Sequence, residues 1–508
     1  MNKQKMAFFA ISLMAANYCA AGGLLTNTNQ NVAFNRMLSR DASIGIDGVY
    51  SNPAGVAFMA DGAHLSINWQ MARQTRTIKN DYALFTNNTN NPITPRDFKG
   101  KAFAPVLPSV QFAYNHKNIS WQAGLAVGGG GGKCKFENGL GSFERIVSET
   151  AAGACAIAGV IDQTTGTPYF TTDRMFGNEG KYTYESYMRG RQYYYGLSLG
   201  AAYKFRPDLS GYVGLRGIYA TCNYYGYVRN IKVGNVPLYS MLDATRTNSA
   251  DIELNCNQSG FGFTPIIGID YKTKHWNFAA KYEFKTRIRL KNESVNQIPS
   301  IGNLPANLIN AFVQAGIPEQ TAAAIVSSER VAGAMTSLKS GFDKELTQAI
   351  GEYADDAQIP GDIPAMLTVG VGYSPVTPLR INAGFHYYWD KQAVSYNHHE
   401  KKLKRGTYEL SAGVEYDAAK FITVSAGWQN TNYGITDSYM DDKSFVVNSN
   451  SVAAGACLHL SKTIDVNIAY FCTLYGHKKT AEQSAGGNYT ADYTRSNNVL
   501  GIGVDLNL

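Results

Sequence analysis

The chain ends in the stretch Leu500-Gly501-Ile502-Gly503-Val504-Asp505-Leu506-Asn507-Leu508, where apolar and small or polar residues alternate strictly. Successive side chains of a β-strand point to opposite faces, so this period of two predicts a strand with one apolar and one polar face. Both a soluble sheet and the wall of a membrane barrel contain such strands. The pattern of the rest of the chain distinguishes a soluble sheet from a membrane barrel.

The same alternation recurs along the whole sequence, most clearly in 275–290 and 379–390. We expect fourteen strands, near residues 62–78, 103–115, 118–130, 189–205, 210–227, 252–271, 275–290, 364–374, 378–391, 405–417, 420–433, 450–460, 463–475 and 494–508. Short connections alternate with long ones between them. An even number of strands with this order of connections is typical of outer-membrane barrels, in which tight periplasmic turns alternate with external loops.

A soluble β-sandwich is the alternative for alternating strands. The expected strands are longer than sandwich strands, and tyrosine and tryptophan collect near their ends. Among 508 residues there are 50 glycines, 33 tyrosines and 23 phenylalanines, and only 17% are charged. The mean hydropathy of −0.23 fits a barrel as well, because lipid-facing and lumen-facing residues cancel. We therefore predict an all-β, 14-stranded antiparallel transmembrane β-barrel.

Residues 1–21 have the pattern of a secretory signal peptide. Lys3 and Lys5 form its charged start, Met6 to Ala16 its apolar part, and Cys19-Ala20-Ala21 a small-residue cleavage site. After it, no apolar run approaches the roughly 18 residues of a spanning helix. Strands must therefore cross any membrane that the protein spans.

A compact segment of small residues, from Ser39 to Gly55, precedes the first expected strand. It lacks the alternation of a strand, and Asp47-Gly48 and Asn52-Pro53 are pairs that turn the chain back on itself. We interpret 22–61 as an N-terminal hatch inside the barrel, and 62–508 as the barrel with its external loops.

With these features the chain resembles the FadL/TodX family of outer-membrane transporters for long-chain fatty acids and aromatic hydrocarbons. Asn52, Pro53 and Ala54 stand where that family has its Asn-Pro-Ala hatch motif, and Tyr387-Tyr388-Trp389 resembles the aromatic end of one of its strands. A long insertion after Tyr282-Glu283-Phe284 also matches. The chain departs from the pattern in ending with Leu508 rather than an aromatic residue, and in its large external loops.

The resemblance implies a monomeric, multi-pass barrel in the outer membrane of a Gram-negative bacterium. Its function would be passive uptake of a hydrophobic small molecule, such as a long-chain fatty acid. Substrate would be captured outside, bound in the lumen and released laterally, and outer-membrane lipids would be its other partners. No cofactor is implied.

Two long external loops are expected, at 131–188 and 291–363. In the second, Leu304, Leu308 and Phe312 follow a helical period, and another helix is expected from Pro318. The apolar faces of these helices either form a first groove for substrate or pack together as a lid. The sequence leaves both alternatives open.

Five consecutive glycines, Gly128, Gly129, Gly130, Gly131 and Gly132, follow the third expected strand. In general such a run is the flexible base of a loop. Glycines also permit bulges and kinks, and the family resembled here has a lateral opening at a kinked third strand. The run is therefore our candidate lateral gate.

Basic residues on one strand are expected to face the lumen and to bind a substrate carboxylate, because an unpaired buried charge is costly. The candidates are Lys281, Lys285, Arg287 and Arg289, with Arg216 on another strand. The alternative is that these cations are hydrated or pair with hatch carboxylates such as Asp41 or Asp47.

Six cysteines remain after cleavage, in an oxidising location. Cys222 and Cys256 lie on neighbouring strands with the same inward parity, so a disulfide is expected between them, and Cys134 and Cys155 are expected to close one external loop. Cys457 and Cys472 have opposite parity and should be thiols. No metal site is predicted, because no pair has metal-ligand spacing.

Two other functions compete with hydrophobic uptake. An outer-membrane lipase or protease would need a catalytic constellation, and the histidines are scattered without a recognisable nucleophile motif, so we predict no enzyme and no catalytic residue. A general porin is disfavoured by the hatch. The net charge of +7 falls to about +5 without the signal peptide, and no basic cluster resembles a nucleic-acid footprint.

Overall fold

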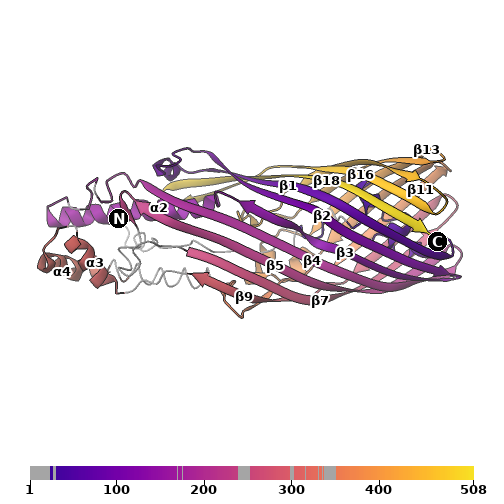
Figure 1. The fold of residues 1–508 in the computed structure, drawn as a ribbon, viewed down its shortest axis with the longest axis horizontal. Helices are drawn as coiled ribbons and strands as arrows, with labels where there is room; N and C mark the ends of the chain where they lie inside the picture. The colour runs from indigo at the N-terminus through magenta and orange to yellow at the C-terminus, as the bar shows by residue number, and fades with distance from the viewer. Residues whose placement is uncertain are drawn as a thin grey trace.

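The protein is a single long barrel whose wall is one closed antiparallel sheet (Figure 1). The computed structural model describes residues 23–26, 30–168, 170–173, 175–237, 252–297, 303–314, 316–329, 331–333, 336 and 351–508. The predicted signal peptide, 1–21, lies outside the described residues. The first wall strand pairs with the second and with the last, which closes the barrel.

Eighteen strand segments make up this sheet in the described part of the chain. Their bounds are β1 (Gly62–Asp81), β2 (Arg96–His116), β3 (Ile119–Phe136), β4 (Tyr182–Arg206), β5 (Leu209–Val233), β6 (Val236–Pro237), β7 (Ile252–Lys272), β8 (Trp276–Glu283), β9 (Arg289–Gln297), β10 (Gln358–Pro360), β11 (Met366–Val376), β12 (Leu379–Tyr388), β13 (Thr407–Ala419), β14 (Ile422–Asn432), β15 (Ser449–His459), β16 (Ile464–Tyr475), β17 (Lys478–Ser484) and β18 (Gly487–Asn507).

The predicted count of fourteen wall strands is confirmed. β6, β10 and β17 are short segments at the loop end and are not counted as wall strands. β8 and β9 both pair with β7 and together make one broken wall strand, which leaves fourteen. The short turns all lie at the end of the barrel that carries the C terminus (Figure 1). Several strands are longer than predicted at the opposite end, where β2 begins at Arg96 and β4 at Tyr182.

The predicted strand 275–290 is wrong in one respect, because it is broken between β8 and β9. Glu283 lies opposite Ile266 of β7, and Lys291 lies opposite Ser259. Eight steps on β8–β9 therefore face seven on β7, and this one extra residue is a bulge. Beyond a one-residue bulge every side chain changes face.

The longer helices cover the end of the barrel opposite the C terminus (Figure 1). The helical elements are α1 (Val32–Asn35), η1 (Ile46–Val49), η2 (Gly55–Phe58), η3 (Ala83–Asn87), α2 (Gly141–Thr165), α3 (Leu304–Gln314), α4 (Glu319–Ser327), η5 (Asp390–Gln392), η6 (Tyr396–Lys402) and η7 (Asp437–Tyr439). The two helices predicted in 291–363 are confirmed as α3 and α4, whereas α2 was not predicted.

The apolar faces of α3 and α4 are largely occupied within the structure. Phe312, Ala322 and Val326 are buried, and the ring of Phe312 lies 4.6 Å from that of Phe170 in the loop after α2. This favours the lid alternative over an open groove. No helix in the described residues is long and apolar enough to cross a membrane.

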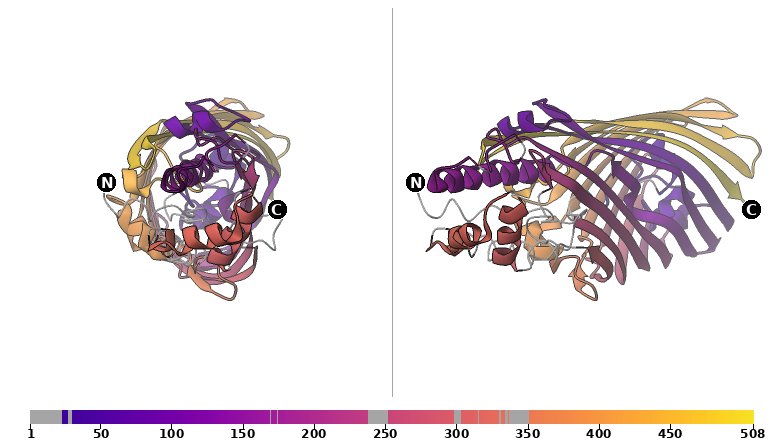
Figure 2. Two further views of the ribbon diagram at one scale, coloured as in Figure 1. Left: turned by 90° about the vertical axis from the view of Figure 1, so that its left-hand side faces the viewer. Right: turned by 60° about the vertical axis from the view of Figure 1, so that its left-hand side comes forward.

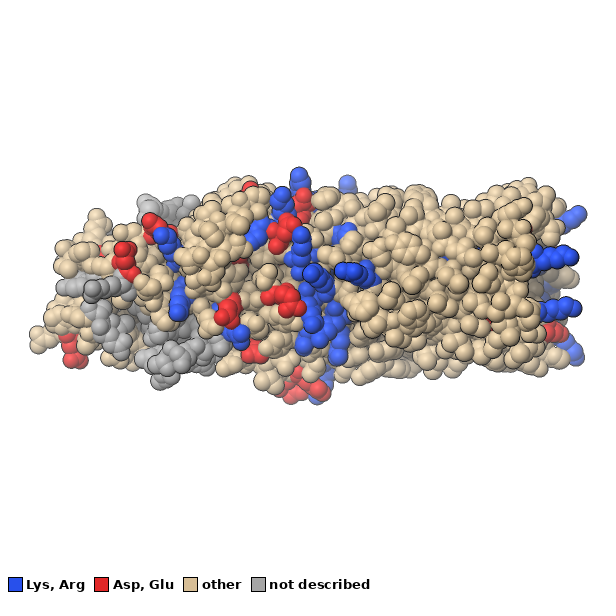
Figure 3. Space-filling view, turned by 45° about the horizontal axis from the view of Figure 1, so that its top comes forward, with Lys and Arg blue, Asp and Glu red and all other residues tan. Residues whose placement is uncertain are grey.

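The outward positions of the wall strands are apolar over a broad band. Leu199, Val213, Phe261 and Ile269 are each about half exposed or more, while their neighbours along the strands face inward. Figure 3 shows this band as a zone almost free of charged side chains, with lysine and arginine at both its edges. An exposed apolar surface of this extent is typical of contact with lipid.

Candidate functional site

A segment near the N terminus, residues 30–61, lies inside the ring of strands (Figure 2). We call it the lumen segment. It contains α1, η1 and η2, and almost all of its side chains from Gln30 to Ala57 are buried. Asn31 caps α1 by accepting a hydrogen bond from Ala33 N, and its amide donates to Ser66 and Gln111 of the wall. Local capping and hydrogen bonds to the wall therefore both hold the segment in place.

The Asn-Pro-Ala motif is bonded to the wall at each of its three residues. Asn52 Nδ2 donates to Asp270 Oδ2 over 2.5 Å, and Asn52 Oδ1 accepts from Gly55 N within the turn. Gln122 donates to Pro53 O, and Ser210 to Ala54 O, each over 2.7 Å. Three strands, β3, β5 and β7, therefore hold one turn of the lumen segment. These bonds restrict the movement of the motif.

A buried charge network joins the lumen segment to β13. Arg40 forms a two-pronged contact with Asp47, at 2.8 and 2.9 Å, and reaches Glu415 at 3.0 Å. Arg36 contacts the same Glu415 oxygen at 2.6 Å. Burial lowers the pKa of Arg40, but the carboxylates of Asp47 and Glu415 outweigh it and hold that pKa above its ordinary value.

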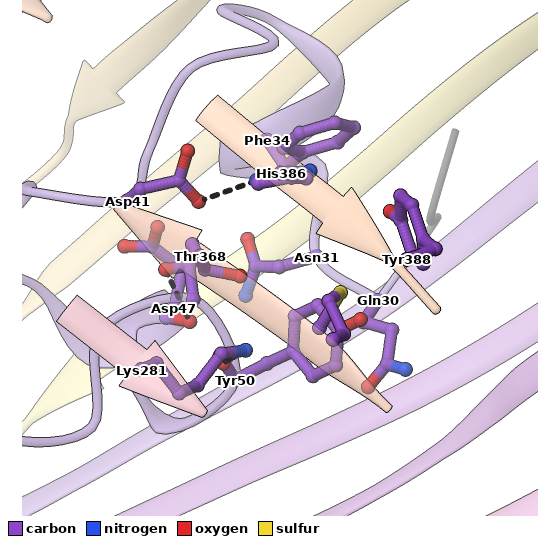
Figure 4. Close-up of a pocket in the computed structure, with 12 residues that line it drawn as sticks. Gln30, Asn31, Phe34, Asp41, Asp47, Tyr50, Lys281, Thr368, His386 and Tyr388 are labelled. Carbon is purple, nitrogen blue, oxygen red and sulfur yellow. Dashed lines mark hydrogen bonds and ion pairs between the residues drawn. The ribbon is translucent and has the colours of Figure 1, made fainter. Parts of the chain in front are cut away.

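His386 of β12 forms a second link. One imidazole nitrogen lies 3.0 Å from Asp41 of the lumen segment (Figure 4). The other lies 3.0 Å from Glu409 of β13. Tyr388 donates to Glu409 over 2.7 Å. Asp41, one of the two predicted hatch carboxylates, thus has a wall histidine rather than a lysine or arginine as its partner.

The predicted carboxylate-binding cations divide into two groups. Lys281 and Arg216 face the lumen, and both contact Glu283, at 2.9 and 2.6 Å. Lys281 also donates to Tyr50 O over 2.7 Å, so it touches the lumen segment. Two cations and one carboxylate leave this cluster with a net charge of +1.

The predicted inward orientation is wrong for Arg287 and Arg289. Arg287 and Arg289 are exposed, and Lys285 lies at the break between β8 and β9, 3.5 Å from Asp362. Because of the one-residue bulge, Ile288 and Leu290 face the lumen in place of the basic residues, and both are buried.

A narrow cavity of about 20 Å³ separates the lumen segment from the wall. Lys281, Tyr50, His386 and Tyr388 line it, together with Gln30 (Figure 4). Drug-sized ligands occupy sites of about 300 to 1,000 Å³. The structure therefore represents a closed arrangement at this point of the lumen.

Towards the end of the barrel that carries the helices, the lumen beyond this cavity is apolar. The buried cluster includes Leu25, Tyr194, Ile218, Tyr224, Ile288, Leu290, Tyr353 and Met366. These residues were not predicted from the sequence, because the apolar residues around a substrate were expected to come from the hatch and the loops. For Ile288 and Leu290 the signal is the parity change at the bulge, which is visible only in the pairing register, whereas Ile218 and Tyr224 share the inward parity of Arg216 on β5.

The glycine run lies where the wall is irregular. Between Ala126 and Cys134, β3 has no ladder pairs with β2, and its register against β4 shifts twice, around Gly129. Gly130 has φ +86°, and a Cβ there would meet Gln192 O at 2.4 Å. Leu24 lies against Gly129, and Gly128 and Leu25 line a small cavity with Arg216 and Ile218.

No disulfide joins either predicted cysteine pair in the structure. Cys222 lies opposite Gln258 and Cys256 opposite Tyr224, so the two cysteines are offset by two residues on neighbouring strands. Cys134 belongs to β3 and Cys155 to the buried face of α2. Parity alone could not reveal these offsets.

One group of side chains has donor types that zinc accepts. Cys457, His459 and Asp465 have ligand atoms within 4.8 Å of one another, near the end of the barrel with the short turns. Both ring nitrogens of His459 have protein partners, Asp465 at 2.7 Å and Thr423 at 2.9 Å. As arranged, the group serves as a hydrogen-bonded link between β14, β15 and β16.

Replacing Asp390 by asparagine is expected to stabilise the fold by about 3 kcal/mol near pH 7.5. Asp390 is buried just beyond β12, where burial raises its pKa to about 6 against the opposing hydrogen bond from Thr407 N. The unfolded carboxyl titrates near pH 3.8, so stability falls as pH rises from about 4 to 6. Asparagine removes this charge and still accepts the Thr407 bond.

The measurement is urea unfolding in detergent micelles at pH 4 and pH 7.5. The gain of Asp390→Asn should fall to about 0.5 kcal/mol at the lower pH. Asp437→Asn, at an exposed carboxylate in η7, is the control and should change stability by less than about 0.5 kcal/mol at both pH values. An equal gain at both pH values would show that ionisation of Asp390 is not the cause.

Solved structures with the same fold were found over nearly the whole chain. A FadL homologue from Pseudomonas aeruginosa matches with a TM-score of 0.61 and 12% sequence identity, over 96% of this chain and 100% of that one. The toluene transporter TodX of P. putida matches with a TM-score of 0.51 and 12% identity, over 91% and 94%. The fold implied by the resemblance is thereby confirmed.

No family model and no curated protein matches the sequence. At 12% identity the two structures establish the fold and leave the substrate to be argued from this chain's own residues.

Proposed function

We propose that this protein is an outer-membrane transporter for the passive uptake of hydrophobic small molecules, including long-chain fatty acids. The observation that carries the proposal is the juxtaposition of an apolar lumen, an interrupted wall at the glycine run and a lumen segment that closes the path between them. The similar structures are described as a FadL homologue and a toluene transporter, which supports transport rather than catalysis.

The proposed path runs through the apolar cluster towards the gap between β2 and β3. Leu25 belongs to this cluster, and Leu24 packs on its edge and against Gly129. Residues just before the lumen segment thus touch both the binding region and the glycine run. Movement of the lumen segment as a hatch would change this contact, and lateral release would follow at the gap. The loop helices act as a lid in this scheme.

We also infer how a fatty acid would be oriented in the lumen. Lys281 lines the narrow cavity and Arg216 the neighbouring one, and their cluster with Glu283 keeps a net charge of +1. A carboxylate placed there would neutralise the cluster, while its hydrocarbon chain would lie among Ile218, Ile288 and Leu290. A neutral hydrocarbon would use the apolar part alone.

Uptake by cells tests the proposed function. Gram-negative cells with and without the protein are supplied with radiolabelled long-chain fatty acids and, separately, with labelled alkylbenzenes. The protein should raise the initial rate of uptake for at least one of the two classes. Equal rates for both classes with and without the protein would refute the proposal.

Replacing Lys281 by glutamine is expected to weaken fatty acid binding about tenfold or more and to spare a neutral alkylbenzene. The change removes the excess positive charge and leaves Glu283 paired with Arg216, so no buried carboxylate is orphaned. Binding to the purified protein in detergent is measured for both ligands. Lys274→Gln, at an exposed turn, is the control. Equal loss for both ligands would reject a carboxylate-binding role for Lys281.

A further inference from the structure

Six basic side chains face outward on three neighbouring wall strands. We call them the basic patch: Lys99 and Lys101 on β2, Lys133 and Lys135 on β3, and Arg189 and Arg191 on β4. They share the face of the exposed Phe103 and Tyr195, whereas the intervening Ala102 and Phe136 are buried. Figure 3 shows lysine and arginine gathered at this edge of the uncharged band.

The pairing register places like charges directly opposite one another. Lys135 lies between Lys101 of β2 and Arg189 of β4, and Lys133 lies opposite Arg191. Directly opposed side chains are about 5 Å apart, where like charges destabilise a sheet. An anion bound between these strands would relieve the repulsion among the opposed cations.

Partners within the chain neutralise little of the patch. Lys99 forms an ion pair with Asp97 at 3.2 Å, and Arg189 donates to the neutral Asn223. Within the described residues, the Nε atoms of Arg189 and Arg191 are buried without a hydrogen-bond partner. Both arginines are half-buried at the outer surface, and the planar fork of a guanidinium matches the oxygens of a phosphate.

The patch also lies at the height of a lipid headgroup. On β4 the outward aromatic and aliphatic residues run from Tyr193 to Phe205. At a rise of about 3.3 Å per residue and a tilt of about 45°, these twelve steps span roughly 28 Å, close to the thickness of a hydrocarbon core. Arg191 and Arg189 are the next outward positions beyond Tyr193.

We propose that the basic patch binds the phosphate groups of a lipid headgroup in the outer leaflet. The inference rests on the proposed outer-membrane location and adds a second ligand to it. Lys101, Lys133 and Lys135 stand at the upper end of the gap between β2 and β3. A lipid phosphate that contacts β2 and β3 together would sit directly above the proposed lateral opening.

Binding of lipid A to the purified protein in a nonionic detergent tests the site. The probes are bisphosphorylated lipid A, dephosphorylated lipid A and inorganic phosphate. The variant carries Lys133→Gln, Lys135→Gln, Arg189→Gln and Arg191→Gln, and should bind bisphosphorylated lipid A at least tenfold more weakly. Dephosphorylated lipid A should bind weakly to both proteins, and so should inorganic phosphate, because it lacks the acyl chains that pack on the apolar band.

Two further proteins make the result decisive. A control with Lys117→Gln, Lys274→Gln, Lys420→Gln and Lys462→Gln loses the same charge at the opposite edge of the band and should bind like the wild type. If the fourfold patch variant fails to fold, Lys133→Gln with Lys135→Gln replaces it, with an expected loss of at least threefold. Unchanged lipid A binding by the folded variant, or equal binding of dephosphorylated lipid A, would overturn the proposal. Solute uptake is measured separately, so a failure of the transport proposal can be distinguished from a failure of the lipid-binding proposal.

Discussion

Deleting Gly130 and Gly131 is expected to close the wall and to reduce uptake at least tenfold, while capture of substrate at the outer end persists. Six steps on β3, from Val127 to Lys133, face only four steps on β4, from Tyr195 to Arg191. Removing two residues equalises the lengths, and an even number preserves the face of every later side chain. Lys133 and Lys135 would therefore still point outward.

The neighbouring strand can accept this change. β2 already has one more residue than β1 between Ala104 and Leu107. After the deletion, β2 would also have one more residue than β3 over the present gap, so a single bulge in β2 would serve both of its neighbours. The strained position at Gly130, with φ +86°, would no longer exist.

Initial uptake rates of a labelled alkylbenzene measure the effect. Amide hydrogen exchange at Phe103, Ala104, Val106 and Leu107, the residues of this stretch that have an amide hydrogen, reports whether the gap has closed. Deleting Gly166 and Thr167, in the loop after α2, is the length-matched control and should leave uptake within about twofold. Slowed exchange together with unchanged uptake would show that substrate does not leave through this gap.

The strand count could be predicted because each wall strand keeps its period of two. Which side chains face the lumen could not be predicted for the parts of the strands that lie outside the membrane band. Between Trp276 and Leu290 the apolar residues stay in one phase, so the sequence shows no break, yet the bulge turns Ile288 and Leu290 inward. Outside the lipid band the outer surface meets water and the apolar residues gather in the lumen, which reverses the rule used for the rest of the strand.

The helix α2 shows a different limit. Its residues Phe143, Val147, Ala151 and Ala158 are buried at helical spacing, and no proline interrupts Gly141–Thr165. This period is present in the sequence and could have been read. In contrast, the partners of Asn52, Pro53 and Ala54 lie more than 65 positions away, and only the closed sheet brings them together.

Replacing Arg40 by methionine is expected to loosen the lumen segment by about 3 to 5 kcal/mol and to open an ion-conducting path. Methionine fills a similar volume but leaves the buried Asp47 without its two-pronged partner. Removing one member of a buried ion pair costs about this much, because the remaining charge is uncompensated. Glu415 is less affected, since Arg36 still lies 2.6 Å from it.

Single-channel recording in planar lipid bilayers and limited proteolysis of residues 30–61 measure the change. The wild type should conduct poorly, and Arg40→Met should show frequent open events and faster cleavage. Arg206→Met breaks an exposed ion pair with Asp208, which is worth about 0 to 1 kcal/mol, and should behave like the wild type.

The double variant Arg40→Met with Asp47→Asn separates charge from packing. If the orphaned carboxylate is what loosens the segment, neutralising it should restore much of the closed behaviour, because no unpaired charge then remains at this place. If the double variant conducts as readily as Arg40→Met, loss of the contact to Glu415 is responsible instead. The ion pair between Arg40 and Asp47 would then be incidental to closure, and the link from Arg40 to β13 would be the contact that keeps the lumen shut.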